Sequence, residues 1–524
     1  MNKNNHKIAV IGLDGATFDL LTPWINQGKL PTFKRLMDMG CWGPLESTFP
    51  PSTPPAWASF MTGKNPGKHG IFDFIDIKGN GLRLINSKRI GKGKVWNYLS
   101  TYGKKCIILN VPLTYPPDPL KDGIMVTGML TPPSKPFTYP EDLADKIKMN
   151  VGQYRIDVDS KNKKKQKDAY LKDIYETTEL RTRCAKYLLQ NYQWDFFMMV
   201  YTSTDRLQHV FWNNHDIMLD YYIKLDEHIG ELIECLGHNV SIIFISDHGF
   251  RGIRQRLFLN KWLEKEGYLT LKRVWTRKKT SLRWKLLVGK DRNKQKSLFN
   301  TFFDFIHFKR RWGIDWKSTR AYSKNPEGCI YINTKGRNET GIVNMGREYE
   351  DLRDEIISKL THFESPFNGK KVFDRILKKE DVYNGPYLDV APDILLQCSD
   401  DSMIILKRQL GKKELFKNYD DRFLSSGHSL NGIFLLTGPF VKKDTNIKGQ
   451  KIQDIAPTIM YLMGLPIPED MDGMVLKNVF EESYLEKHPL RYEKMLTEKQ
   501  NDVDVYSNED EQEIKAHLEG LGYL

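Results

Sequence analysis

The chain has 524 residues, more than one hydrophobic core usually supports, which predicts a large α/β unit with insertions or two domains. Its 40% hydrophobic, 28% charged and 12% aromatic residues exclude disordered and fibrous proteins. No stretch approaches the roughly 20 uninterrupted apolar residues of a membrane span, and the six cysteines show no CxxC spacing. We therefore expect a cytoplasmic protein without a disulfide framework.

The net charge of +13 is concentrated in one segment. Residues 272–317 contain fifteen Lys or Arg against three Asp, which gives this segment a net charge of +12. The rest of the chain is nearly neutral, so the basic isoelectric point says little about nucleic acid binding.

Strand-like and helix-like segments alternate along the chain. The expected strands are Lys7–Leu13, Lys105–Val111, Trp194–Thr202, Val240–Ile245, Cys329–Asn333, Ile394–Gln397 and Gly432–Thr437; the expected helices are Asp168–Gln190, Asp216–Leu236, Ile452–Met463 and Asn508–Leu524. Lys161–Lys167 is expected to be a solvated loop. This alternation predicts an α/β fold with a mostly parallel central sheet flanked by helices.

Three carboxylates follow predicted strands directly: Asp14, Asp205 and Asp247. Any one of them alone would be interpreted as a helix N-cap. Because ligands of open α/β sheets bind outside the carboxyl ends of the strands, three together indicate a binding site.

Histidines strengthen this interpretation. His209 lies four residues after Asp205, so both would share one helix face, and His248 follows Asp247, with Gly249 permitting a tight turn. His428 is expected in a loop of small residues before a strand. Nitrogen and oxygen ligands without cysteine suit Zn²⁺ or Mn²⁺.

Thr53 precedes Pro54 and Pro55 at the predicted start of a helix. A threonine N-cap followed by proline is a common helix start. The same geometry would place a nucleophilic hydroxyl among unpaired N–H groups that bind phosphate. Beside a metal cluster, the sequence favours the nucleophile.

The motifs LDGATFD, PPSTPPAWASFMTGKNPGKHGIFDF, TDRLQHVFW, SDHGF and GHSLNGIFLLTGP resemble the alkaline phosphatase superfamily, specifically its type I phosphodiesterase and nucleotide pyrophosphatase branch. The resemblance implies a three-layer alkaline-phosphatase-like fold and two divalent metal ions, zinc or manganese. One ion would be held by Asp205, His209 and His428, and the other by Asp14, Asp247 and His248 with the Thr53 oxygen. It implies hydrolysis of phosphodiester or pyrophosphate bonds through a phospho-threonine intermediate.

One departure from the family concerns the substrate. Ala56 stands where eukaryotic nucleotide pyrophosphatases have an asparagine that contacts the phosphate, so this donor is missing or comes from elsewhere. The alternatives are a phosphomonoesterase or phosphomutase of the same superfamily, or a membrane-peripheral binding protein that retains the fold without enzymatic activity. We expect a small, lipid-linked or glycan-linked phosphate ester as substrate, and no specific nucleic acid binding.

The expected organisation is a catalytic core in two parts, 1–271 and 318–480, a basic insertion at 272–317, and a helical tail at 481–524. The insertion holds four of the eleven tryptophans, and its apolar residues between Leu298 and Ile306 are spaced like one face of a helix. Three interpretations stay open: a lid on the core, an element resting on an anionic membrane, or a wall for a polyanionic substrate.

Overall fold

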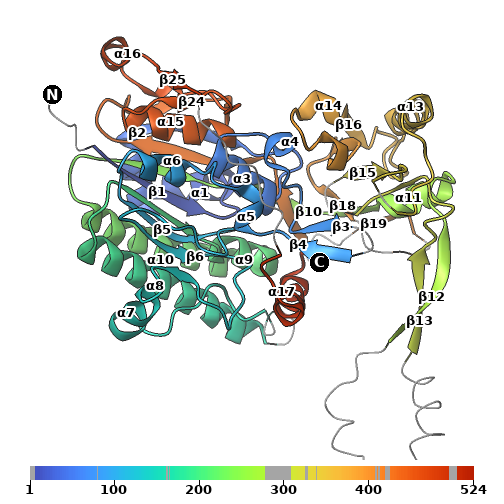
Figure 1. The fold of residues 1–524 in the computed structure, drawn as a ribbon, viewed down its shortest axis with the longest axis horizontal. Coiled ribbons are helices and arrows are strands. Elements are labelled where there is room, and N and C mark those ends of the chain that lie inside the picture. The colour runs from blue at the N-terminus through green and yellow to red at the C-terminus, as the bar shows by residue number, and fades with distance from the viewer. Residues whose placement is uncertain are drawn as a thin grey trace, which may run out of the picture.

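The computed structural model describes residues 6–78, 81–160, 163, 166–277, 308–324, 328–337, 339–406, 410, 414–418, 425–494 and 504–523 (Figure 1). None of the helices in these ranges is long and apolar enough to cross a membrane.

A ten-stranded sheet forms the centre of the larger part of the molecule, in the order β22-β2-β21-β9-β1-β8-β5-β6-β7, with β23 also pairing with β2. Its strands are β1 (Lys7–Leu13), β2 (Gly40–Glu46), β5 (Cys106–Val111), β6 (Ile124–Thr127), β7 (Thr138–Tyr139), β8 (Phe196–Tyr201), β9 (Val240–Ile245), β21 (Asn431–Thr437), β22 (Thr445–Asn446) and β23 (Gln450–Lys451). The central strands β9, β1, β8, β5 and β6 are parallel, and β21 pairs antiparallel with both β2 and β9. The prediction of a mostly parallel sheet is confirmed.

Helices cover both faces of this sheet, which gives three layers (Figure 1). One face carries α1 (Phe18–Asn26), α2 (Pro31–Asp38), α7 (Leu143–Asn150), α8 (Lys167–Asn191), α9 (Ser203–Phe211) and α10 (His215–Leu236), and the other carries α3 (Thr53–Thr62), α6 (Val95–Thr101) and α15 (Ile455–Leu462). The strand β1 shows why both faces are buried. Ile8 and Val10 enter one hydrophobic cluster while Ala9, Ile11 and Leu13 enter the other, since successive side chains of a strand point to opposite faces.

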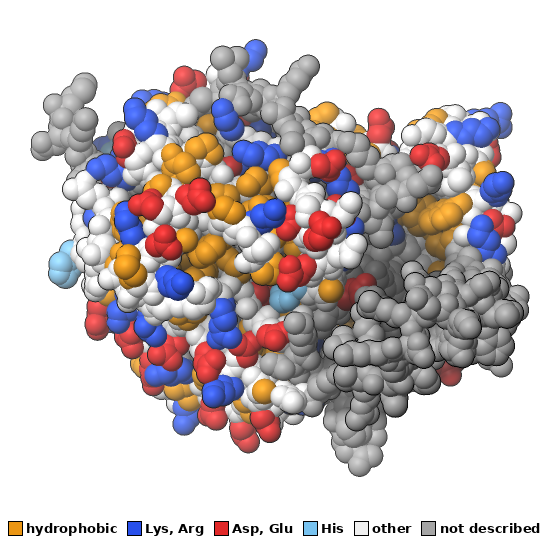
Figure 2. Space-filling view, turned by 60° about the horizontal axis from the view of Figure 1, so that its bottom comes forward, with side chains coloured by type: hydrophobic (Ala, Val, Ile, Leu, Met, Phe, Trp, Pro, Cys, Tyr) orange, Lys and Arg blue, Asp and Glu red, His pale blue; other side chains and the backbone are white. Residues whose placement is uncertain are grey.

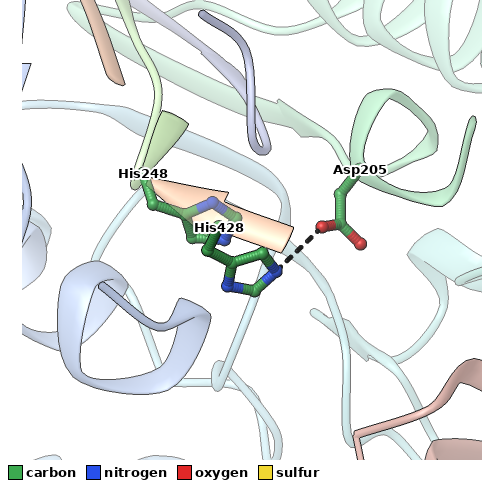
Figure 3. A group of neighbouring side chains, drawn as sticks. All are labelled: Asp205, His248 and His428. Carbon is green, nitrogen blue, oxygen red and sulfur yellow. Dashed lines mark ion pairs between the residues drawn. The ribbon is translucent and has the colours of Figure 1, made fainter. Parts of the chain in front are cut away.

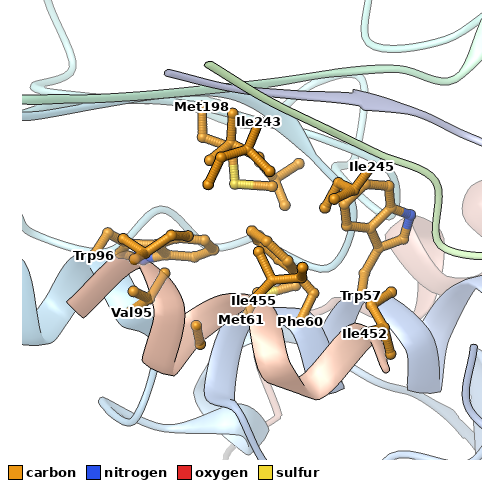
Figure 4. Close-up of a cluster of buried hydrophobic side chains, with 14 of the residues drawn as sticks. Trp57, Phe60, Met61, Val95, Trp96, Met198, Ile243, Ile245, Ile452 and Ile455 are labelled. Atoms are coloured by element: carbon orange, nitrogen blue, oxygen red, sulfur yellow. The ribbon is translucent and has the colours of Figure 1, made fainter. Parts of the chain in front are cut away.

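The cluster under α3 fixes the position of that helix. Trp57 and Phe60 of α3 pack with Trp96 of α6 against Met198 and Ile245 of the sheet (Figure 4). All five side chains are buried. Because this packing is dense and made of large side chains, it holds the N-terminus of α3 in a fixed position over the sheet.

A smaller part of the molecule is built from residues between β10 (Gly249–Ile253) and β20 (Ser425–Ser429), and it has its own hydrophobic cluster. It contains β11 (Gln255–Phe258), β14 (Ala321–Tyr322), β15 (Cys329–Ile332), β16 (Phe373–Lys378), β17 (Ile394–Cys398), β18 (Met403–Leu406), β19 (Phe416–Asn418), α11 (Leu259–Lys265), α13 (Arg347–Thr361), α14 (Lys379–Val382) and η2 (Leu388–Val390). Its sheets have the orders β14-β15-β17-β16 and β18-β11-β19.

The basic insertion begins and ends in a two-stranded antiparallel ribbon of β12 (Leu271–Arg277) and β13 (Phe308–Ile314). In Figure 1 this ribbon points away from the rest of the smaller part. The helix predicted between Leu298 and Ile306 lies outside the described residues, as does most of the loop predicted at Lys161–Lys167. The three interpretations of the insertion therefore stay predictions.

The remaining elements lie around the two parts. They are α4 (Pro66–His69), β3 (Ile75–Lys78), β4 (Gly81–Leu84), α5 (Ser87–Ile90), η4 (Ile452–Asp454), β24 (Ile467–Pro468), η5 (Lys477–Val479), α16 (Glu482–Lys487), β25 (Tyr492–Glu493) and α17 (Asn508–Leu521). The last helix, α17, contributes Leu518 to the cluster under α3 and Leu521 to the cluster on the other face. Figure 2 shows basic and acidic side chains interspersed over the described surface on one side of the molecule.

Candidate metal centre and nucleophile

The carboxyl ends of three adjacent parallel strands bring four of the predicted residues together. Asp14 directly follows β1, Asp247 and His248 follow β9, and Asp205 lies in α9, which begins two residues after β8. These strands are neighbours in the order β9-β1-β8. None of the three aspartates caps a helix: the cap of α1 is Thr17, and that of α9 is Thr202.

As their spacing in the sequence predicts, Asp205 and His209 lie on one face of a helix. Both residues lie on α9, one turn apart, and His209 Nε2 is 3.3 Å from Asp205 Oδ1. Asp205 is fully buried, whereas the side chain of His209 keeps 22% of its exposure. The pair is therefore open to solvent on the side of the imidazole.

His428 lies in β20, so the prediction of a loop at this residue is wrong. This strand pairs antiparallel with β10, and His428 is opposite Phe250, two residues beyond His248. Gly249 begins β10, directly after a bend at Asp247 and His248. A Cβ atom there would lie 2.0 Å from the Asn431 carbonyl oxygen, so glycine is needed for close packing.

Thr53 is the first residue of α3, and the helix cap is Ser52. The prediction that Thr53 is the N-cap is therefore wrong by one residue, and the Thr53 hydroxyl does not cap the helix. Its Oγ1 is 3.2 Å from His248 Nε2. Thr53 has no exposed surface in the structure, and Pro54, Pro55 and Trp57 of the same helix are buried as well.

The first set of side chains forms a triangle of donor atoms. His428 Nε2 is 3.3 Å from His209 Nε2 and 3.4 Å from Asp205 Oδ1, and the third side is the 3.3 Å contact between His209 and Asp205. Figure 3 shows His428 directed at the carboxylate of Asp205, with the ring of His248 alongside.

The second set surrounds His248 Nε2, which lies 3.3 Å from Asp247 Oδ2 and 3.7 Å from Asp14 Oδ1. The rings of His248 and His428 stack with centroids 3.7 Å apart, so the two sets adjoin each other. Donor atoms of His248 also lie within 4.8 Å of those of Asp205 and His428. His248 thus faces both candidate sites, a position that the sequence does not indicate.

The protonation of the imidazoles suits metal binding. Nδ1 of His248 is 3.0 Å from the Gly249 carbonyl oxygen, which can only accept a hydrogen bond, so its proton is on Nδ1 and Nε2 carries a lone pair. His428 Nδ1 is directed at the Pro51 carbonyl oxygen in the same way. Burial lowers the pKa of His209 to about 4 and that of His248 well below its ordinary value. Neutral rings leave lone pairs available.

Two of the three carboxylates, Asp14 and Asp247, lack a cationic side chain as a partner in the described part of the chain. Asp205 instead pairs with Arg206 at 2.6 Å, and despite its burial the neighbouring His209 and Arg206 hold its pKa well below the ordinary value. Asp14 Oδ1, Asp205 Oδ1 and Asp247 Oδ2 are buried and accept no hydrogen bond from the described residues. Burial and the neighbouring carboxylates raise the pKa of Asp14 well above its ordinary value, and burial raises that of Asp247 to about 7. Buried acids of this kind call for a cation, because a buried charge without a partner is unfavourable.

The distances fit two divalent ions. Tetrahedral coordination with bonds of 2.0–2.2 Å places ligand atoms about 3.3–3.6 Å apart. The first triangle has sides of 3.3, 3.3 and 3.4 Å, and the second set has contacts of 3.3 and 3.7 Å. Donor atoms at these separations match the edges of a tetrahedron around one ion. The residues present therefore fit the predicted metal pair.

Several supporting residues escaped the sequence analysis. Trp57 Nε1 donates to Asp14 Oδ2 at 3.4 Å, and the backbone N–H of Gly15 donates to Asp247 Oδ1 at 3.1 Å. Arg206 Nη1 donates to Asp205 Oδ2 at 2.6 Å. The adjacent position of Arg206 in STDRLQH was the only signal in the sequence, because its other partner, Asp157, is 49 residues away.

Arg206 holds together a buried charge network, and its loss should destabilise the protein. Its guanidinium pairs with Asp157 at 2.7 Å and Asp205 at 2.6 Å, and all three side chains are at most 7% exposed. Arg206→Met leaves both carboxylates without this partner, so we expect metal-free protein to lose about 3–5 kcal/mol of unfolding free energy. Denaturant titration measures this. Arg347→Met, at an exposed arginine, is the control and should change stability by less than about 1 kcal/mol.

The chain is similar to a known protein family in sequence and to solved structures in fold. The family model for type I phosphodiesterase / nucleotide pyrophosphatase matches residues 8–422. No curated protein matches the chain at a significant level. Among solved structures, an inactive variant of murine ectonucleotide pyrophosphatase / phosphodiesterase 5 in complex with AMP is similar, with 15% identity, a TM-score of 0.50, and coverage of 91% of this chain and 100% of that one. Phosphonoacetate hydrolase from Sinorhizobium meliloti 1021 is also similar, with 13% identity, a TM-score of 0.50, and coverage of 88% of this chain and 95% of that one.

The structural similarity shows a shared fold, and the predicted alkaline-phosphatase-like architecture is confirmed. The family match extends from β1 to the segment just before β20, so it includes all the predicted site residues except His428. The chain therefore belongs to the type I phosphodiesterase / nucleotide pyrophosphatase family, a family of hydrolases.

Proposed function

We propose that this protein is a metal-dependent hydrolase of phosphodiester or pyrophosphate bonds, with Thr53 as its nucleophile. The observation that carries the proposal is the position of Thr53 Oγ1, 3.2 Å from His248 Nε2 and at the first residue of α3, beside two sets of donor atoms. The Thr53 hydroxyl does not cap the helix, and it faces His248, whose imidazole adjoins both sets.

Each set of side chains would hold one divalent ion. Asp205, His209 and His428 provide two nitrogens and one oxygen, and Asp14, Asp247 and His248 provide one nitrogen and two oxygens. Mixed nitrogen and oxygen donors suit Zn²⁺, with Mn²⁺ as the second choice. When bound, such a pair of ions would supply positive charge that stabilises the attacking and leaving oxygens of a displacement at phosphorus.

Thr53 Oγ1 would attack the phosphorus atom, forming a phosphate ester on the threonine while the bond to the leaving oxygen breaks and that oxygen takes up the proton that Oγ1 loses. Water then hydrolyses this ester and restores the hydroxyl. The buried, packed start of α3 supports this role because it holds Oγ1 in one place. The murine relative supports it too, since a threonine-to-alanine variant of that protein is described as inactive and holds AMP.

The family match supports a phosphate ester as the substrate. We propose a phosphate diester or pyrophosphate of a small molecule, or one linked to a lipid or glycan. Ala56 is fully buried within α3, and its methyl group provides no hydrogen-bond donor of the kind found in eukaryotic relatives. A panel of dinucleotides, nucleotide sugars, glycerophosphodiesters and phosphomonoesters would identify the leaving group.

The decisive experiment uses bis(4-nitrophenyl) phosphate as a generic diester. We expect hydrolysis that stops after treatment with a chelator and returns on addition of Zn²⁺ or Mn²⁺. The matched substrate 4-nitrophenyl phosphate, a monoester, should be cleaved more slowly. Activity that persists after exhaustive metal removal would contradict the two-metal proposal, and a clear preference for the monoester would favour the phosphomonoesterase alternative.

A further inference from the structure

The last described residues of the chain contact the candidate metal centre. Tyr523 follows α17 after the left-handed residue Gly522, and its hydroxyl donates to Asp205 Oδ2 at 2.8 Å. Arg206 Nη1 lies 2.6 Å from the same tyrosine oxygen and also 2.6 Å from Asp205 Oδ2. A segment that is 318 residues away in sequence therefore completes the hydrogen bonding of a candidate ligand.

The two oxygens of Asp205 have different surroundings. Oδ2 accepts hydrogen bonds from both Arg206 and Tyr523, while Oδ1 accepts none from the described residues and faces His209 and His428 at 3.3 and 3.4 Å. Two donors on Oδ2 prevent the carboxylate from rotating. Oδ1 is thereby kept on the side where the two imidazoles converge.

The position of Tyr523 is fixed by packing as well as by these hydrogen bonds. Its ring lies 4.9 Å from that of Phe74 and 6.3 Å from that of His209, centroid to centroid, and the Arg206 guanidinium lies 5.2 Å from the ring centre. Leu518 and Leu521 anchor the preceding helix in the two hydrophobic clusters. The Tyr523 hydroxyl is the donor in its contact with Asp205, because a carboxylate oxygen can only accept a hydrogen bond.

We infer that Tyr523 is a positioning residue of the metal centre, and that docking of α17 and metal binding at Asp205 are coupled. The inference rests on the proposed function, since it assumes that Asp205 binds an ion. Hydrogen-bond partners behind a ligand set its orientation, and losing one typically costs about 10–100-fold in metal affinity. The coupling is reciprocal, so the ion must also stabilise the docked helix.

The test is Zn²⁺ titration of metal-free protein, comparing the wild type with Tyr523→Phe and Tyr506→Phe. Tyr523→Phe keeps the ring and removes only the hydroxyl, so we expect one of two Zn²⁺ sites to weaken by about 10–100-fold. Tyr506→Phe is the matched control, because its hydroxyl also ties the segment before α17 to the core, at the Leu130 and Ile85 carbonyl oxygens, but does not touch Asp205. Its Zn²⁺ affinity should equal that of the wild type.

Amide hydrogen exchange provides a second measurement that a merely structural tyrosine would not affect. Zn²⁺ should slow exchange across Asn508–Leu521 in the wild type, and this effect should be much smaller in Tyr523→Phe. Equal Zn²⁺ affinity for Tyr523→Phe and the wild type would overturn the inference while leaving the metal site intact. A wild-type protein that binds no Zn²⁺ or Mn²⁺ would overturn the proposed function together with it.

Discussion

Thr53→Ala is expected to reduce turnover of a phosphodiester by at least about a thousandfold, because it removes the attacking oxygen. Metal content should remain close to that of the wild type, since the nitrogen and carboxylate donors of both sets are untouched. The fold should also remain intact, as α3 is held by the packing of Trp57 and Phe60. Steady-state rates with bis(4-nitrophenyl) phosphate and elemental analysis of the purified variant measure the two effects.

Thr62→Ala is the matched control for this experiment. Thr62 lies at the other end of α3, and its hydroxyl donates to the Ala58 carbonyl oxygen at 2.7 Å within the same helix. Turnover should stay near the wild-type value in this variant. Wild-type turnover in Thr53→Ala would show that another group is the nucleophile.

His209→Ala should act on metal binding first and on turnover as a consequence. The substitution removes one of two imidazoles from the set around Asp205, and a two-ligand site binds a divalent ion weakly. We expect the purified variant to hold about one ion in place of two, with turnover at least about a hundredfold lower. Mass spectrometric metal analysis after dialysis gives the stoichiometry.

Addition of excess Zn²⁺ separates the two effects of His209→Ala. If the loss of activity follows from the empty site, millimolar Zn²⁺ should restore part of the turnover by mass action. His362→Ala is the control, because this exposed histidine has its ring directed at the Ser358 carbonyl oxygen, on another helix of the smaller part. Two tightly held ions in His209→Ala would show that His209 is not a ligand.

Local sequence patterns were sufficient to predict the strands that are buried on both faces and the helices that are amphipathic along their length. Lys7–Leu13 and Val240–Ile245 are strands with the predicted bounds, since continuous apolar runs of this length suit the centre of a parallel sheet. The helices at Asp168–Gln190 and Asp216–Leu236 also form, as Lys167–Asn191 and His215–Leu236.

The strand Gly40–Glu46 was not predicted, because its conformation depends on tertiary contacts. Its sequence, GCWGPLE, contains glycines and a proline that disfavour strands in isolation. Both glycines are needed for close approach: a Cβ at Gly40 would lie 2.1 Å from the Leu436 carbonyl oxygen, and one at Gly43 would lie 2.0 Å from that of Ile447. Such a strand depends on its neighbours for its conformation.

The candidate site residues could be predicted from the sequence, because carboxylates after strands, a helical Asp–His pair and a hydroxyl at a helix start are local features. How these residues combine in space depends on long-range contacts. His428 reaches Asp205 because β10 and β20 pair across 171 intervening residues, and His248 adjoins both donor sets because its ring stacks on His428. The same holds for Arg206 and Tyr523, whose partners lie up to 318 residues apart. Long-range pairing and packing have no signature within a short window of sequence, so their geometry appears only in the folded chain.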